Sequence, residues 1–273
     1  METNKELQED LKEIEKWLSE TRGLESGLQI VDKEGSINFK CDGCRDGKSE
    51  CCTNRDDILI APYDMYKMQK GLNRTYDEIV DKGYVKHTLG ADSKIPILIL
   101  QNNYTYDGEK ICKFLKRIDI DGQKKRGCSI HKFKPSVCEL FPLGRFTKID
   151  KTTKDKKMYY VLQDTSCGIA EDNVIKIRDW ALDIDNSERA FLQFNDFLSA
   201  LHKKINVKNL MVSKQIPNEE KKIFVASYFT TLYSYDTNND FFEQFDVRSE
   251  IVLKIAENFT KTLKKYDKSI IPK

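Results

Sequence analysis

Four of the eight cysteines of the chain lie within twelve residues, in the stretch CDGCRDGKSECC that runs from Cys41 to Cys52. Four thiolates complete the ligand set of a zinc ion or of an iron–sulfur cluster. The turn-forming residues between them, such as Asp42, Gly43 and Gly47, would let this loop wrap around a metal. The stretch therefore suggests a zinc knuckle, an iron–sulfur ligand set, a redox centre or a disulfide staple.

The other four cysteines form a second candidate set, and each of them comes from a different segment. They are Cys112, Cys128, Cys138 and Cys167. All eight lie between residues 41 and 167, whereas cysteines used as small core residues would be spread over the whole chain. This clustering favours a shared site. Because neighbouring side chains of an extended segment point to opposite faces, Cys51 and Cys52 could serve two different centres. A vicinal disulfide is the alternative.

The composition indicates a globular protein without a general affinity for nucleic acid or membranes. The 273 residues are 39% hydrophobic and 33% charged, and the formal net charge is +2. The first residues are polar and acidic, unlike a secretory signal, and the longest apolar run, Ile95–Leu100, is too short to cross a bilayer. We therefore expect a cytoplasmic protein, where structural disulfides are rare.

The spacing of the cysteines does not by itself identify the metal. A zinc ribbon would show two CxxC knuckles, and this chain has one. The run of cysteines typical of bacterial ferredoxins is absent as well. Sulfur-only ligation suits both iron and zinc, so this choice stays open at the level of the residues.

Four stretches of the sequence resemble the zinc- or iron-chelating cysteine-cluster family, with which the flagellin lysine N-methylases are grouped. They are CDGCRDGKSECC, DDILIAPYDMYKM (56–68), CKFL (112–115) and CSIHKFKPSVCELFP (128–142). The resemblance covers about residues 39–170 and implies that all eight cysteines are candidate ligands. The sequence departs from the family at Lys134 and Glu139, where arginine is common, and at Gly168, where a proline is expected.

Few residues near the cysteines suggest a catalytic role. His131 follows Cys128 by three positions and is a weak candidate for proton transfer or for hydrogen bonding to a sulfur, although a structural role is favoured. Asp64 is more simply explained as support for the first turn of a helix that begins at Pro62. We interpret His87 and His202 as structural or surface residues. The basic runs 124–126 and 154–157 are typical of solvated loop tips.

The pattern of apolar residues predicts an α+β fold: a cysteine-rich metal-binding core with short strands and helices, followed by an α-helical C-terminal bundle. We divide the chain into an N-terminal helix with lead-in strands (1–38), the metal-binding core (39–170) and the bundle (171–273). Short elements are expected at the following positions: helices at 4–20, 62–69, 75–83 and 135–141, strands at 28–31, 37–39, 58–60 and 95–101, and a hairpin of 145–149 with 158–162.

The predicted bundle has four helices, each marked by apolar residues at helical spacing. The first carries Val174, Ile177, Trp180, Ala181 and Ile184 on one face. The second is centred on the phenylalanines of 191–201, the third begins after Pro217, and the fourth covers about 252–263. The aromatic residues of these helices are expected to form the core.

The favoured function is that of a metal-binding protein with one or two cysteine-thiolate centres, of the iron–sulfur type and most simply 4Fe-4S, used for electron transfer or catalysis. An electron-transfer role would involve a redox partner. Structural zinc in a protein-interaction module is the alternative. A metal-dependent protein lysine N-methylase, with S-adenosylmethionine as cosubstrate, is implied by the family resemblance alone. No P-loop and no Rossmann glycine motif is present.

Overall fold

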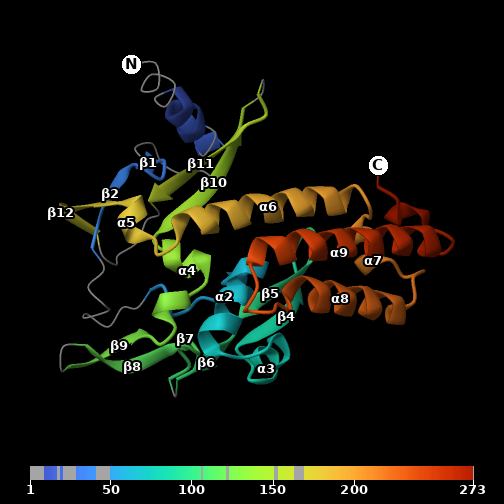
Figure 1. The fold of residues 1–273 in the computed structure, drawn as a ribbon, viewed down its shortest axis with the longest axis horizontal. Coiled ribbons are helices and arrows are strands. Elements are labelled where there is room, and N and C mark those ends of the chain that lie inside the picture. The colour runs from blue at the N-terminus through green and yellow to red at the C-terminus, as the bar shows by residue number, and fades with distance from the viewer. Residues whose placement is uncertain are drawn as a thin grey trace. The chain divides into compact units, whose positions relative to one another are not determined.

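The computed structural model describes residues 9–16, 19–20, 29–40, 50–105, 107–120, 123–150, 153–162 and 169–272 (Figure 1). Helices and strands are mixed in the first two thirds, and the C-terminal region is helical, so the α+β prediction is confirmed. In the described ranges, no helix is both long and apolar enough to cross a membrane.

The chain forms two compact units, and each of them is assembled from separate stretches. Unit 1 comprises residues 1–51, 118–126 and 139–184, and unit 2 comprises residues 52–117, 127–138 and 185–273. The boundaries that we predicted from the sequence, near residues 38 and 170, stay a prediction.

Unit 1 is built on short antiparallel strands. Strand β11 (Lys156–Leu162) lies between β1 (Ile30–Val31) and β10 (Leu143–Ile149), and β2 (Ser36–Phe39) pairs with β12 (Ile169–Lys176). The hairpin of β10 and β11 confirms the predicted one, with Ile149 opposite Lys156. Helical residues 9–16 belong to the expected N-terminal helix, and Ile14 is buried there against Ile30, Tyr159 and Val161.

The predicted helical face that begins at Val174 is wrong. Residues Ile169–Lys176 form strand β12, and only a single turn of helix, α5 (Ile177–Trp180), follows it. Val174 is opposite Asn38 of β2, and its side chain is 69% exposed. Pairing with a strand more than 130 residues earlier overrides the local helical spacing, which is a tertiary effect that the local pattern does not contain.

Unit 2 begins with a three-stranded antiparallel sheet and two helices. The strand order is β3 (Leu59–Ile60), β5 (Pro96–Leu100) and β4 (Val85–Leu89). Helix α2 (Pro62–Leu72) has proline in its first turn, where the missing N–H does no harm. Helix α3 (Tyr76–Asp81) starts with a capping box: the Thr75 hydroxyl accepts the Glu78 N–H, and the Glu78 carboxylate accepts the Thr75 N–H.

Smaller elements follow and carry three of the cysteines. Strand β6 (Asn102–Tyr104) pairs with β7 (Lys110–Cys112), and β8 (Leu115–Ile120) pairs with β9 (Gln123–Cys128). A turn of 3-10 helix, η1 (His131–Phe133), leads to the short helix α4 (Ser136–Leu140). Helix α4 lies within the segment 135–141 for which the sequence predicted one or two helical turns, whereas η1 precedes that segment and was not predicted.

The C-terminal region of unit 2 is a layer of helices, drawn in orange to red in Figure 1. Its elements are α6 (Ile184–His202), α7 (Val207–Val212), α8 (Asn218–Tyr233), α9 (Phe241–Leu263) and the 3-10 turn η2 (Lys268–Ile270). Asp240 caps α9, because its carboxylate accepts the N–H groups of Phe242 and Glu243. These helices confirm the second, third and fourth predicted ones, but α9 begins at Phe241, well before the predicted start near residue 252.

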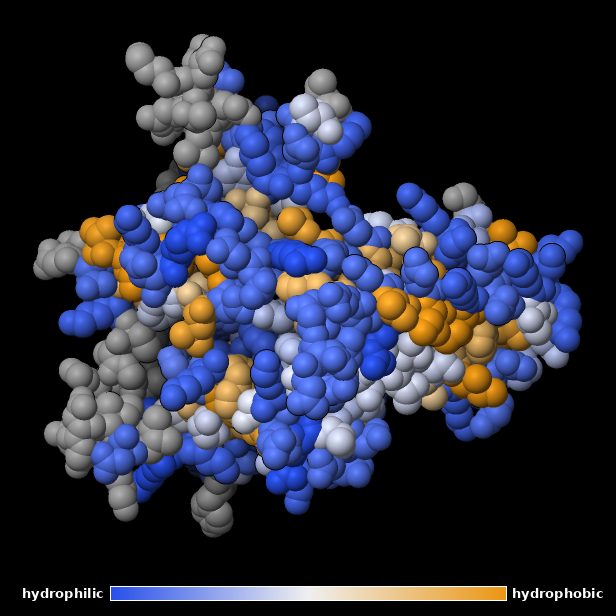
Figure 2. Space-filling view, in the orientation of Figure 1, coloured by the Kyte–Doolittle hydropathy of each residue, from blue (hydrophilic) through white to orange (hydrophobic). Residues whose placement is uncertain are grey.

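One apolar core joins this helical layer to α2 and the β3–β5–β4 sheet. It includes Met65 and Met68 of α2, Leu98 of β5, and Phe224 and Val252 of the helices. Buried Gln69 of α2 adds two hydrogen bonds to this core. Its side chain donates to the Tyr235 carbonyl and accepts the Tyr235 N–H, each over 3.3 Å. Hydrophilic residues predominate on the face drawn in Figure 2, and its apolar residues form separate patches.

Candidate metal centre

Five of the eight cysteines belong to the described residues, and all five are half-buried: Cys51, Cys52, Cys112, Cys128 and Cys138. Cys41, Cys44 and Cys167 lie outside the described residues, as does most of the CDGCRDGKSECC loop. The structure draws no disulfide between any two of the five described cysteines. The complete ligand sets that we predicted therefore stay predictions.

Cys52 and Cys112 are brought together by backbone pairing. The Cys112 N–H donates to the Cys52 carbonyl over 2.8 Å, and the Asn54 N–H donates to the Lys110 carbonyl over 2.8 Å. Between these two bonds, Thr53 and Ile111 form an antiparallel bridge. Cys52 and Cys112 are thus opposite each other on neighbouring segments. In such a pair the Cα atoms are about 5.5 Å apart, and both side chains lie on the same face.

The strand that carries Cys112 is held on both of its edges. On the side away from Cys52, β7 pairs with β6, and Cys112 is opposite Asn102. The Asn102 side chain in turn donates to the Arg55 carbonyl over 2.5 Å, which ties β6 to the segment that follows Cys52. The backbones of Cys52 and Cys112 are therefore held in place by hydrogen bonds of the protein itself. Cys52 belongs to the first set of cysteines predicted from the sequence, and Cys112 belongs to the second.

The vicinal cysteines lie on either side of a structural boundary. Cys51 ends the first stretch of unit 1, and Cys52 begins unit 2. Cys52 is already part of the backbone bridge to Cys112, whereas Cys51 lies in the turn that precedes it. This division is consistent with the prediction that the two serve different centres, which stays a prediction.

Cys128 and Cys138 are placed by short polar contacts next to the core of unit 2. Cys128 ends β9, and the following Ser129 donates its N–H and its hydroxyl to the Phe114 carbonyl, over 2.9 and 3.1 Å. Cys138 lies in the first turn of α4, where its N–H donates to the Pro135 carbonyl over 2.9 Å. Like Cys112, both pack against the apolar core of unit 2, so part of each side chain is shielded from water.

Asp64 fixes the start of α4 to the start of α2. Its side chain is only 4% exposed, and one oxygen accepts the N–H and the hydroxyl of Ser136 over 2.7 and 2.6 Å. The other oxygen accepts the Ala61 N–H over 3.1 Å. The Lys67 ammonium is 3.7 Å from the first oxygen and 3.4 Å from the Ser136 hydroxyl. The structural role predicted for Asp64 is therefore supported, and it extends to positioning the segment that carries Cys138.

Tyr63 and Asp57, two residues of the stretch DDILIAPYDMYKM (56–68), contact other parts of the protein. Tyr63 is buried with its ring 4.9 Å from that of Phe241. Asp57 accepts two hydrogen bonds from the Arg55 guanidinium, over 2.7 and 3.1 Å, and these bonds lower the pKa of its carboxyl. His131 is exposed in η1. The weak candidacy of His131 for proton transfer or for hydrogen bonding to a sulfur stays a prediction.

Metal binding by the described residues alone would be incomplete. Among the side chains that the structure describes, no three histidines, cysteines, aspartates or glutamates lie close enough together to hold a metal ion. The Cys52–Cys112 pair supplies two sulfur donors, whereas a tetrahedral thiolate site needs four. The donor chemistry fits zinc or an iron–sulfur cluster, but a full set requires cysteines from outside the described ranges.

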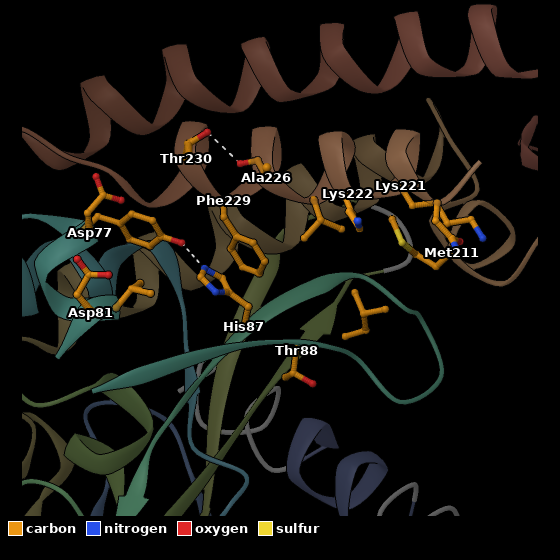
Figure 3. Close-up of a pocket in the computed structure, with 15 residues that line it drawn as sticks. Asp77, Asp81, His87, Thr88, Met211, Lys221, Lys222, Ala226, Phe229 and Thr230 are labelled. Carbon is orange, nitrogen blue, oxygen red and sulfur yellow. Dashed lines mark hydrogen bonds between the residues drawn. The ribbon is translucent and has the colours of Figure 1, made fainter. Parts of the chain in front are cut away.

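A second feature of unit 2 was not predicted from the sequence. A pocket of about 770 Å³ is lined by α3, β4, the end of α7 and α8 (Figure 3). The Tyr76 hydroxyl and the His87 Nε2 are 2.5 Å apart there, and the His87 ring meets the ring of Phe229 edge-on at 4.4 Å. His87 and Phe229 come from elements far apart in sequence, so no local pattern could have revealed their meeting.

Comparison with known proteins found no similar chain. No protein-family model matches the sequence, and neither the curated proteins nor the solved structures gave a match. The resemblance to the zinc- or iron-chelating cysteine-cluster family therefore rests on the motifs of this sequence.

Proposed function

We propose that this protein binds metal through cysteine thiolates, in one or two centres of the iron–sulfur type that serve electron transfer or catalysis. The observation that carries the proposal is the backbone bridge that holds Cys52 opposite Cys112. Two half-buried thiols on the same face of paired segments offer adjacent soft donors, the kind that zinc and iron–sulfur clusters prefer.

The surroundings of these cysteines also suit a metal centre. Partial burial against the core limits access of water, which helps to set the potential of an iron–sulfur cluster. The Asp64 contacts hold Cys138 in a defined place, although it lies on a short helix. When bound, the metal would supply a redox-active or structural centre, and the protein residues would hold it and shield it.

The proposal includes two consequences for the biology of the protein. An electron-transfer role requires a redox partner, and we propose a protein in that role. We also propose a cytoplasmic location, because a reducing compartment keeps thiols available as metal ligands.

Metal analysis of the full-length chain, purified without oxygen, tests this function directly. We expect iron and acid-labile sulfide together with broad absorption in the visible range. The variants Cys52→Ser and Cys112→Ser should each lose at least half of the bound iron. Asn103→Ser, a substitution by the same residue at an exposed position of the adjoining β6 strand, should keep it.

The possible results separate the metals. Stoichiometric zinc in a colourless protein would support thiolate binding but replace the iron–sulfur assignment with structural zinc. Iron retained by both cysteine variants would exclude the Cys52–Cys112 pair from the site. Absence of any metal after anaerobic purification and reconstitution would overturn the proposal.

A further inference from the structure

The pocket of unit 2 has the size of a small-molecule site. Its volume of about 770 Å³ lies within the range of roughly 300–1,000 Å³ that is usual for ligand pockets. One wall is helix α8, and the opposite wall consists of α3 and the edge strand β4. All of its lining residues belong to unit 2, and the pocket therefore does not depend on the placement of unit 1.

Much of the lining of the pocket is apolar. Its apolar members include Val80 of α3, Leu89 of β4, Met211 of α7, and Val225 and Phe229 of α8. Leu89 is 39% exposed, although it is a large hydrophobic residue. When a ligand covers an apolar surface of this kind and displaces water from it, binding becomes more favourable by about 25 cal/mol per Å² of apolar surface buried.

The two ends of the pocket carry opposite charges, as Figure 3 shows. Asp77 and Asp81 lie at one end, and Lys221 and Lys222 lie at the other. Lys222 is paired with Glu219 over 3.1 Å, and Lys221 donates to the Ser213 carbonyl over 2.5 Å. The basic end is therefore already engaged by groups of the protein.

The acidic end is different. Neither Asp77 nor Asp81 has a hydrogen-bond or ion-pair partner among the described residues. Both are exposed, and because they are four positions apart they lie on the same side of α3. A cation beside them would face two negative charges, whereas an anion would be repelled.

The polar pair in the pocket is compatible with a cationic ligand. Burial lowers the pKa of His87, so its imidazole is neutral at neutral pH. Burial also raises the pKa of Tyr76, which keeps its hydroxyl protonated and able to donate to Nε2 of His87. The floor of the pocket therefore adds no positive charge that would repel a cation.

We propose that this pocket binds a small lipophilic amine, with its apolar body against Phe229 and Val225 and its protonated nitrogen beside Asp77 and Asp81. This inference is independent of the proposed metal centre. It assigns the site to one class of ligand because Asp77 and Asp81 are the carboxylates of the lining, Lys221 and Lys222 already contact Ser213 and Glu219, and Thr88 and Asn218 carry no charge.

Three compounds with one apolar body and different ends provide the test: phenylbutylamine, phenylbutanol and phenylbutyrate. Binding to the full-length protein is measured by calorimetry at neutral pH. We expect the amine to bind roughly tenfold more tightly than the alcohol, which corresponds to one charge-assisted contact, and the acid to bind most weakly.

Variants locate the binding and separate its two parts. The double variant Asp77→Asn with Asp81→Asn should bind the amine and the alcohol equally, while its affinity for the alcohol stays unchanged. Asp246→Asn, at an exposed position of α9 outside the pocket, is the matched control and should keep the tenfold preference. Ala226→Phe, at an exposed position of the pocket wall, should weaken the binding of all three compounds by at least tenfold.

Several results would overturn the proposal. Equal binding of the amine and the alcohol to the natural chain would show that the carboxylates do not select a cation. Tighter binding of the acid would assign the pocket to anions. Binding that survives Ala226→Phe would place the ligand elsewhere, and no binding of any of the three compounds would remove the site.

Discussion

In unit 2, helices α8 and α9 meet through buried rings, whereas the segments that carry Cys52, Cys112 and Cys138 are held by hydrogen bonds. Phe224 of α8 is 1% exposed and meets the ring of Phe259 of α9 edge-on at 5.4 Å. The cysteine-bearing segments depend on the bridge at Thr53 and on the Asp64 carboxylate. The first kind of contact is strong and insensitive to geometry, and the second is weaker but directional.

This difference suggests a division of tasks within one unit. The helical layer contributes large apolar side chains, Phe224 and Val252 among them, to the core of unit 2. The cysteine-bearing segments place partly buried thiols against this core, and hydrogen bonds fix their backbones in defined positions. A site that must present thiols to a metal needs such positioning more than it needs stability.

The largest effect is expected in the helical layer. Phe224→Ala should reduce the free energy of unfolding by about 3–5 kcal/mol, because it leaves a cavity next to Phe259. Urea denaturation followed by circular dichroism measures the change. The neighbouring Ile223 is 50% exposed, and Ile223→Ala should change the stability by no more than about 0.5 kcal/mol. Similar losses of unfolding free energy for both variants would show that α8 does not bury the face that carries Phe224.

Asp64→Ala should have the next largest effect. It removes the carboxylate that accepts the Ser136 N–H, the Ser136 hydroxyl and the Ala61 N–H and that lies beside the Lys67 ammonium, which should cost about 2–4 kcal/mol. Ser136→Ala removes only the hydroxyl and should cost about 1 kcal/mol. The rate at which a thiol reagent labels Cys138 should rise in Asp64→Ala more than in Phe224→Ala. An unchanged rate would mean that Asp64 does not position Cys138.

Gly71 of α2 tests the contact that supports η1. A methyl group at this position would overlap the ring of Phe133. Gly71→Ala raises helix propensity by about 1 kcal/mol, but this overlap should make the net change destabilising by about 1–2 kcal/mol. In the Phe133→Ala background the overlap is absent, and Gly71→Ala should become stabilising. Equal effects of Gly71→Ala in both backgrounds would contradict the contact.

The smallest effect concerns pH and the strands of unit 1. The Asp10 carboxylate accepts hydrogen bonds from Lys148 and Tyr159, each 2.5 Å long. Burial alone would raise the pKa of Asp10, but these bonds and the charge of Lys148 outweigh it, so the pKa is lowered. The resulting stability of up to about 1 kcal/mol is present above the unfolded pKa of about 3.9 and is lost as the pH falls below it.

A pair of variants measures this contribution. Asp10→Asn should flatten the dependence of the melting temperature on pH between about pH 5 and pH 3. Glu9→Gln changes an exposed carboxylate of the same helix and should leave the pH dependence as it is. Identical pH profiles for both variants and the natural chain would show that the Asp10 contacts add nothing to stability.

Local signals in the sequence predicted the helices well. Pro62 and Thr75 mark the starts of α2 and α3, and the spacing of phenylalanines marks α6, because caps and apolar periodicity are encoded in adjacent residues. Strand β12 was missed for the opposite reason, since its partner β2 is far away in the sequence. The short strands β6 and β7 carry no apolar alternation that would have indicated them.

For the candidate site, the sequence predicts a chemistry, thiolate ligation, which stays a prediction, and it does not predict how the cysteines are arranged. The clustering of cysteines indicates thiolate ligands, but the sequence grouped Cys52 with Cys41 and Cys112 with Cys128. The structure places Cys52 opposite Cys112 because backbone bonds between two distant segments decide the neighbours. The pocket likewise depends on a contact between His87 and Phe229, which are far apart in the sequence. The sequence indicated only that aromatic residues would be buried.

The division into two units has a consequence for how this protein can be changed by evolution or engineering. The chain passes from one unit to the other after residues 51, 117, 126, 138 and 184. No continuous part of the gene therefore encodes either unit. A fragment that begins after residue 184 would carry the C-terminal helices without α2 and the β3–β5–β4 sheet, and its apolar surface would be exposed to water. Neither unit can be exchanged, fused or lost as a module, so the two must be inherited together.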